Sequence, residues 1–231
     1  VADTDPGTEA AIQRPLSADA LDDSPEAART AAALKELLAF AHKHLDAHPH
    51  NAVRQTRGLF SANFIITRGS ASVSDLPPRR HTPEGAALVS ACPTALGVAR
   101  AVGLQAASNS AMTGNLDTDL HAKFDAAATL FMDRHFVAIH IKGTDIAAHD
   151  RRPLEKRDLI SAVDKELGLF LTEHPDVTEG LRVVVSADHG TSSVTGNHLP
   201  DPVPVLVSTW NGPSEPATFD EESAEQGALG L

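Results

Sequence analysis

The sequence predicts an α/β fold in which a mostly parallel sheet carries helices on both faces. Segments with apolar residues at helical spacing alternate with short apolar segments from residue 86 to residue 187. Glycine, proline and polar residues separate these segments, as turns require. With 231 residues, 42% of them hydrophobic, the chain can bury a substantial core. Parallel strands joined by crossover helices are the ordinary outcome of such an alternation.

The first part of the chain predicts a loop followed by one long helix. Residues 1–23 are rich in Asp, Ala, Pro and Thr and show no sustained period. Ser24 then offers an N-cap and Pro25 suits the first helical position. Apolar residues recur every three or four positions after it, which predicts a helix over 25–45. Pro49 and its two flanking histidines predict the break after this helix.

The next part of the chain predicts two strands and a helix. The β-branched segment 62–67 has the composition of a short strand. The polar, proline-bearing stretch 70–85 predicts a loop. Residues 86–92 then predict a strand, and 94–102 a helix that Gly103 ends.

The alternation continues to the C-terminal half of the chain. An apolar face at helical spacing predicts a helix over 117–133, and the apolar run 135–141 predicts a buried strand. The same pair of signals predicts a helix over 154–171 and a strand over 181–187. Functional side chains are therefore expected beyond the carboxyl ends of these strands, where the loops of a parallel sheet converge.

Charge and composition exclude several classes of function. The chain has 19 Lys and Arg against 31 Asp and Glu, a formal charge of −12, which disfavours nucleic acid and anionic membrane surfaces as partners. Cys92 is the only cysteine, so no intrachain disulfide can form. No apolar run approaches the roughly 20 residues that span a bilayer. We expect a cytoplasmic protein, and the opening Val1 leaves room for further sequence upstream.

Acid and imidazole side chains follow two of the predicted strands. Asp145 and His149 stand four residues apart just after the strand 135–141, so one helical turn would align them. Asp188 and His189 directly follow the strand 181–187, and His198 lies in the next loop. Carboxylate and imidazole ligands suit Zn²⁺ or Mn²⁺, and the absence of neighbouring thiols disfavours a soft-metal site.

Each of these motifs is weak alone. An Asp and a His at this spacing arise by chance in a chain of this size, and Asp-His-Gly is a common turn after a strand. Their joint placement at successive strand ends favours a metal site. From the residues alone, a structural role for these side chains in the turns is as plausible as a metal site.

The runs 140–150, 156–164, 187–191 and 198–205 resemble archaeal-type, cofactor-independent (2,3-bisphosphoglycerate-independent) phosphoglycerate mutases of the alkaline phosphatase superfamily. The resemblance covers nearly the whole chain. Upstream and near the C-terminal end, further matches keep the family's order: His48-Pro49, Asn51, Arg54, Gly58, Ala62-Asn63, Arg68-Gly69, Thr113-Gly114, Asp117-Thr118, Lys123, Phe219-Asp220-Glu221 and Gly227.

The resemblance implies two divalent metal ions, Mn²⁺ or Zn²⁺, with Mg²⁺ and Co²⁺ as further candidates. One ion would be held by Asp145, His149 and His198, and Asp188 and His189 would contribute to the second. The family's second ion also takes an aspartate and a nucleophilic Ser or Thr from an N-terminal segment. No part of this chain matches that segment, so an N-terminal segment or a companion chain is expected to complete the site.

The resemblance also implies the domain organisation and the reaction. Residues 1–105 would be part of an inserted substrate-binding domain, and 106–231 part of the metal-binding, phosphatase-like domain. The reaction would interconvert 3-phosphoglycerate and 2-phosphoglycerate, small phosphorylated acids of glycolysis, through a phosphoserine intermediate. The candidate cations for binding the phosphate or carboxylate are Arg54, Arg57, Arg68, Lys123 and Lys142, although a lone Arg or Lys is usually a solvated surface charge.

Two alternatives stay open. The same metal motifs serve phosphatases, phosphodiesterases and phosphonate-metabolising enzymes of the superfamily, because fold and metals do not select the substrate. The other alternative is a non-catalytic, incomplete subunit that needs a partner chain.

Overall fold

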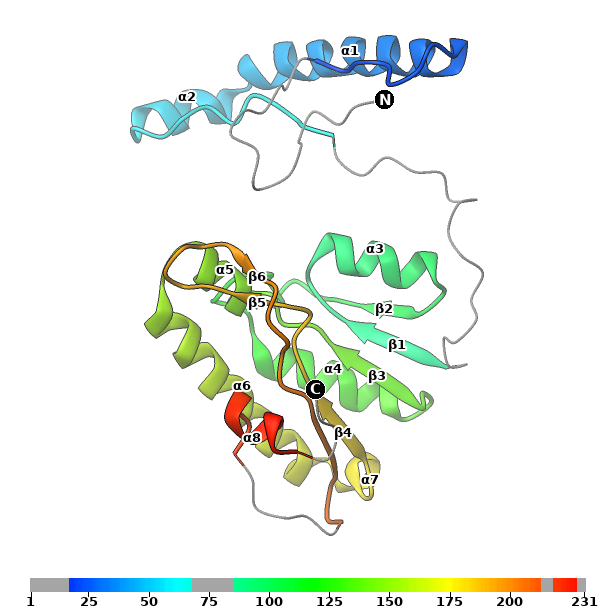
Figure 1. Cartoon of the computed structure of the whole chain (residues 1–231), viewed down its shortest axis with the longest axis vertical. Helices are drawn as coiled ribbons and strands as arrows, with labels where there is room; N and C mark the ends of the chain where they lie inside the picture. Colours follow the sequence, from blue (N-terminus) through cyan, green and yellow to red (C-terminus); the bar gives the residue numbers. More distant parts are fainter. Residues whose placement is uncertain (1–16, 68–84, 213–217, 228–231) are drawn as a thin grey trace. The chain divides into compact units, whose positions relative to one another are not determined.

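The computed structural model describes residues 17–67, 85–212 and 218–227 and divides the chain into two compact units, Val1–Pro77 and Pro78–Leu231. Figure 1 shows the elements of both units. The loop predicted over 70–85 falls almost entirely outside the described ranges, as do residues 1–16 of the opening loop, while residues 17–23 form no helix or strand, as predicted. The predicted domain boundary after residue 105 stays a prediction.

The first unit contains two helices, α1 (Pro25–Asp46) and α2 (Pro49–Thr56). The helix predicted over 25–45 is confirmed, and its cap is the expected one, since the backbone N–H of Ala27 donates to Ser24 Oγ at 3.1 Å. The prediction after it is incomplete. Pro49 not only follows the end of α1 but also opens α2, because proline fits the first turn of a helix without losing a hydrogen bond.

The strand predicted over 62–67 is wrong. These residues form no strand, and the side chain of the buried Asn51 holds the start of the segment instead. Its Oδ1 accepts from the backbone N–H of Ala62 at 2.8 Å, and its Nδ2 donates to the carbonyl of Leu45 at 2.6 Å. A strand requires a neighbouring strand to pair with, and the described part of this unit supplies none.

The second unit begins with a doubly wound sheet. Three parallel strands stand in the order β2-β1-β3, with Leu88 opposite both Ala106 and Ala138. The chain passes from β1 to one neighbour through α3 and then to the other through α4, and right-handed crossovers in opposite directions place these helices on opposite faces. The elements are β1 (Ala86–Val89), α3 (Pro93–Ala101), β2 (Gln105–Ala107), α4 (Leu120–Phe131) and β3 (Phe136–Ile139).

The rest of this unit adds helices and two short antiparallel pairs, β4 with β7 and β5 with β6. The predicted helix over 154–171 and strand over 181–187 are both present, as α6 and β4. The predicted α/β class with a parallel sheet and helices is therefore confirmed. The elements are α5 (Gly143–His149), α6 (Pro153–Glu173), α7 (Pro175–Thr178), β4 (Arg182–Val185), β5 (Gly190–Thr191), β6 (His198–Leu199), β7 (Leu206–Thr209) and α8 (Glu221–Glu225).

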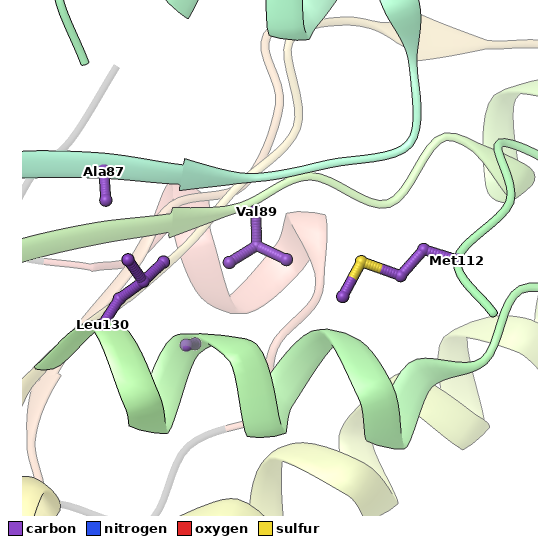
Figure 2. Packing of buried hydrophobic residues seen from close by; sticks show 5 residues of the cluster. Ala87, Val89, Met112 and Leu130 are labelled. Carbon is purple, nitrogen blue, oxygen red and sulfur yellow. The ribbon is translucent and has the colours of Figure 1, made fainter. Parts of the chain in front are cut away.

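The core of the second unit lies on two sides of α4. Figure 2 shows Ala87 and Val89 of β1 facing Leu130 of α4, with Met112 closing the cluster. A second cluster joins α4 to α6, and its buried members are Phe124, Ala128, Phe170 and Leu171. Because α4 buries residues on both sides, it fixes the sheet and α6 to each other, and with them the loops that follow β3 and β4.

Among the helices that the described residues form, none combines the length and the hydropathy needed to cross a membrane.

Candidate metal centre

The first pair of candidate ligands stands on α5, immediately after β3. Asp145 lies in the first turn of this helix and His149 is its last residue, so the predicted four-residue spacing places them on one face. His149 Nε2 lies 3.3 Å from Asp145 Oδ1. The helix can begin here because Gly143 has no side chain: a Cβ would lie 2.7 Å from Leu159 Cδ2 and 2.8 Å from the Asn115 carbonyl oxygen.

The second set of ligands stands on and beside the β5–β6 hairpin. His189 directly precedes β5, and the pairing of Thr191 with His198 brings the two histidines together. Their ring centroids are 3.9 Å apart. Figure 1 shows this hairpin beside α5, so two segments about 40 residues apart in sequence meet at one place.

Asp145, His189 and His198 form a compact group of metal ligands. One ligand atom from each lies within 4.8 Å of the others. Within this group His198 Nε2 lies 3.9 Å from Asp145 Oδ1. A divalent cation with ligand bonds of about 2.0–2.2 Å draws its ligands to within about 3–3.5 Å of one another. The group therefore fits such a cation after small side-chain movements.

His149 is held as a fourth potential ligand. Its Nδ1 lies 2.6 Å from the carbonyl oxygen of Gly196, which can only accept, so Nδ1 carries the proton. Its Nε2 faces the other ligands, 3.3 Å from Asp145 Oδ1 and 3.2 Å from His198 Nε2, and is the nitrogen that a metal ion would bind. A backbone carbonyl that fixes a histidine tautomer in this way is the usual support of a metal-ligating imidazole.

The carboxylate of Asp145 is kept ionised. Burial raises its pKa, but hydrogen bonds from Lys142 to Oδ2 and from Thr191 to Oδ1, together with the Lys142 charge, lower the pKa by more. The net pKa of Asp145 lies below its ordinary value. The group therefore presents a negative charge to a cation at neutral pH.

Asp188 is less enclosed than the other predicted ligands. Its side chain is 81% exposed, and Oδ2 lies 3.4 Å from His189 Nε2. The structure thus brings all five predicted metal ligands into one region. His189, which was predicted to bind the second ion, lies in the same group as Asp145 and His198, which were predicted to bind the first. The division of the ligands between two ions stays a prediction.

The predicted substrate-binding cations have different environments. Lys142 pairs with Asp145 and is 37% exposed, so it lies at the metal ligands. Lys123 is 1% exposed, and its Nζ donates to the His140 carbonyl at 3.3 Å. Burial lowers the pKa of Lys123.

The arginine candidates belong to the first unit. Arg54 Nε donates to the Phe60 carbonyl at 2.8 Å, which closes the turn after α2. Arg57 is exposed at the C-cap of α2, and Arg68 lies outside the described residues. The substrate-binding roles of these five cations stay predictions.

Two residues of the centre were not predicted. Thr191 Oγ1 donates to Asp145 at 2.8 Å and lies 3.2 Å from His189 Nδ1, so it touches ligands from both segments. Lys156 Nζ donates to the Thr191 carbonyl at 3.0 Å and ties α6 to the hairpin. Thr191 could have been suspected from its place directly after Asp-His-Gly, and Lys156 from its place at the start of the family-like stretch 156–164.

Comparison with known proteins shows the family to which this chain belongs. The model of the metalloenzyme superfamily matches residues 97–230, which include every predicted metal ligand. The chain belongs to the metalloenzyme superfamily. Membership in this superfamily implies that the centre binds divalent metal, in agreement with the ligand group found in the structure.

Relatives of this superfamily member include several archaeal proteins named 2,3-bisphosphoglycerate-independent phosphoglycerate mutase. The relative from Picrophilus torridus is 36% identical over 99% of this chain and 56% of its own length. The relative from Thermococcus kodakarensis is 33% identical over 90% of this chain and 51% of its own length. The chain therefore spans about half the length of these relatives.

Solved structures agree with the fold. A Pyrococcus horikoshii protein, 34% identical, superposes with a TM-score of 0.74 over 89% of this chain and 54% of its own. The cofactor-independent phosphoglycerate mutase of Thermoplasma acidophilum, at 21% identity and a TM-score of 0.50, supports the fold alone. The resemblance to this family that the sequence motifs indicated is confirmed.

Proposed function

We propose that this chain carries the metal-binding part of a phosphoglycerate mutase, which interconverts 3-phosphoglycerate and 2-phosphoglycerate in the cytoplasm. The observation that carries the proposal is the compact group of Asp145, His189 and His198, with His149 beside it. The archaeal relatives that match nearly the whole chain support the choice of substrate.

Asp145, His149 and His198 would hold one ion, and Asp188 and His189 would contribute to a second, with Mn²⁺ or Zn²⁺ as the metals. Two bound cations would polarise the phosphoryl oxygens and spread the charge that develops during an in-line displacement. The nucleophilic serine of a phosphoserine intermediate would come from outside these 231 residues.

The chain's own groups prepare this centre. Thr191 and Lys142 hold the carboxylate of Asp145 in its ionised form, and the Gly196 carbonyl orients the His149 ring. Lys142 also places a cation where the phosphate of a small phosphorylated acid would approach the metal ligands. These contacts fix the ligands before substrate arrives, which is the main contribution of a protein to phosphoryl transfer.

Removing single ligands tests the metal assignment. Asp145→Ala and His198→Ala should each reduce the number of Mn²⁺ or Zn²⁺ ions bound per chain, measured by mass spectrometry of the metal after dialysis. The melting temperature of metal-free His198→Ala should change little, because that side chain is 49% exposed. Asp145→Ala also removes the acceptor of the Lys142 and Thr191 hydrogen bonds and should lower the melting temperature more. The matched controls are Asp133→Ala and His135→Ala, exposed residues at the opposite end of β3.

Equal metal content in the ligand variants and the parent would refute the assignment of these ligands. The substrate requires a separate measurement, in which the chain is combined with the remaining part of a relative and given a panel of phosphate monoesters. Interconversion of the two phosphoglycerates supports the mutase. Release of inorganic phosphate from many monoesters would instead identify a phosphatase.

A further inference from the structure

We propose that the exposed valines on the outer face of the β4–β7 pair, Val184 and Val207 with the adjacent Val205, belong to the docking surface for the part of the relatives' chain that has no counterpart in these 231 residues. The inference rests on family membership and on the length of the relatives. It does not depend on the substrate proposed above.

The outer face exposes apolar side chains. In the antiparallel register, Val184 stands opposite Val207, and these side chains are 59% and 50% exposed. Val205 directly precedes β7, two residues before Val207, and is 43% exposed. Two facing valines of the pair and a third valine at its end are thus exposed.

The inner face of the same pair is packed. Val183 contacts the cluster around Phe124 and Phe170, and Leu181 and Trp210 join it from the ends of the two strands. Packing on that side fixes the orientation of the two strands relative to the core. The outer valines are therefore exposed although the strand pair is packed against the rest of the unit. The outer face carries Arg182 opposite Thr209 at one end of the pair, and the next position on this face carries Val184 opposite Val207.

The sequence of β4 gives the same indication independently. Val183, Val184 and Val185 form a continuous apolar run, which is typical of a strand buried on both faces. Among the strands of the described residues, β4 pairs only with β7. Both the face and the second edge of β4 are therefore available to further elements.

The relatives indicate what covers this face. The Picrophilus torridus and Ignicoccus hospitalis proteins match 99% of this chain, yet the match spans only 56% and 55% of their own lengths. Nearly half of each relative lies outside the matched part, so a large part of each relative is available to cover this face. β4 leads directly to Asp188 and His189, so an element docked on its outer face lies next to the metal ligands.

Binding of the complementary part tests the proposal. The unmatched parts of the P. torridus and I. hospitalis relatives would be produced as separate polypeptides and titrated into this chain by calorimetry without metal. We expect saturable one-to-one binding of at least one of them. Val184→Lys and Val207→Lys should each weaken it at least about tenfold, because a buried valine contributes about that much to affinity.

Two further variants separate docking from folding. The double variant Val184→Thr with Val207→Thr keeps β-branched side chains and so preserves the strands, while it also weakens binding. Val98→Lys, at a 58% exposed valine of α3, should leave binding unchanged.

Binding of neither polypeptide, or binding that the outer-face variants leave intact, would overturn the proposal. It would also be overturned by a stable dimer of the parent chain that Val184→Lys dissociates, because a second copy would then cover the face. A phosphate monoester assay of the assembled pair reports separately on the substrate, so failure there leaves the docking result standing.

Discussion

The substitution Gly196→Ala tests how the loop of the β5–β6 hairpin supports the metal ligands. Its φ of +78° belongs to the left-handed region, and a Cβ there would lie 2.9 Å from the carbonyl oxygen of His149. That oxygen belongs to the backbone and cannot rotate away. Gly196→Ala should therefore displace the loop, and with it the Gly196 carbonyl that accepts the Nδ1 proton of His149 at 2.6 Å.

Two costs should follow, and they can be measured separately. A non-glycine residue in the left-handed conformation costs about 1–2 kcal/mol of folding free energy, which lowers the melting temperature by a few degrees. Loss of the group that orients a ligating histidine typically lowers metal affinity about 10–100-fold. Titration with Zn²⁺ or Mn²⁺ against a competing chelator would report the second effect.

Gly180 provides the matched control, since its φ is +68° but a Cβ there would meet nothing within 4 Å. Gly180→Ala should lower the melting temperature by a similar amount and leave metal affinity unchanged. If Gly196→Ala binds metal within threefold of Gly180→Ala, the supporting role of the Gly196 carbonyl is refuted.

Further predictions concern packing and protonation. Gly143→Ala should destabilise the second unit by about 1–3 kcal/mol in chemical denaturation, because the added methyl group would overlap Leu159; Gly97→Ala, with open space around it, should not. The hydrogen bond to Glu166 raises the pKa of His121 above its ordinary value of 6.5. The protonated form is thus the stabilising one, so its contribution is full below pH 6.5 and is lost as the pH rises through the raised pKa. Glu166→Gln should return the pKa of His121, followed by NMR, toward 6.5, and an unchanged titration would contradict this pairing.

Local signals in the sequence predicted the longer helices, α1, α3, α4 and α6, but not the short α2, α7 and α8. The long α1 was predicted because Ser24 and Pro25 mark its start without help from the rest of the molecule. The strand predicted over 62–67 failed for the opposite reason, since a strand exists only with a partner. The two-residue strands β5 and β6 were missed because so short a hairpin leaves no periodic pattern to detect.

The sequence predicted the ligands of the candidate metal centre but not the residues that hold these ligands in place. Asp145 and His149 share a helical turn, a relation that sequence spacing shows directly. The contact between His149 and Gly196 joins residues far apart in sequence and depends on the hairpin geometry, so spacing could not reveal it. The burial of Lys123 had a usable signal, because Lys123 and Ala127 stand four residues apart on the buried side of α4.

Anomalous diffraction from crystals grown with Mn²⁺ or Zn²⁺ tests the central claim most directly. The account predicts a metal peak within about 2.0–2.3 Å of a carboxylate oxygen of Asp145 and of imidazole nitrogens of His198 and a neighbouring histidine. Ions bound only at other places, with Asp145 still paired to Lys142, would contradict it.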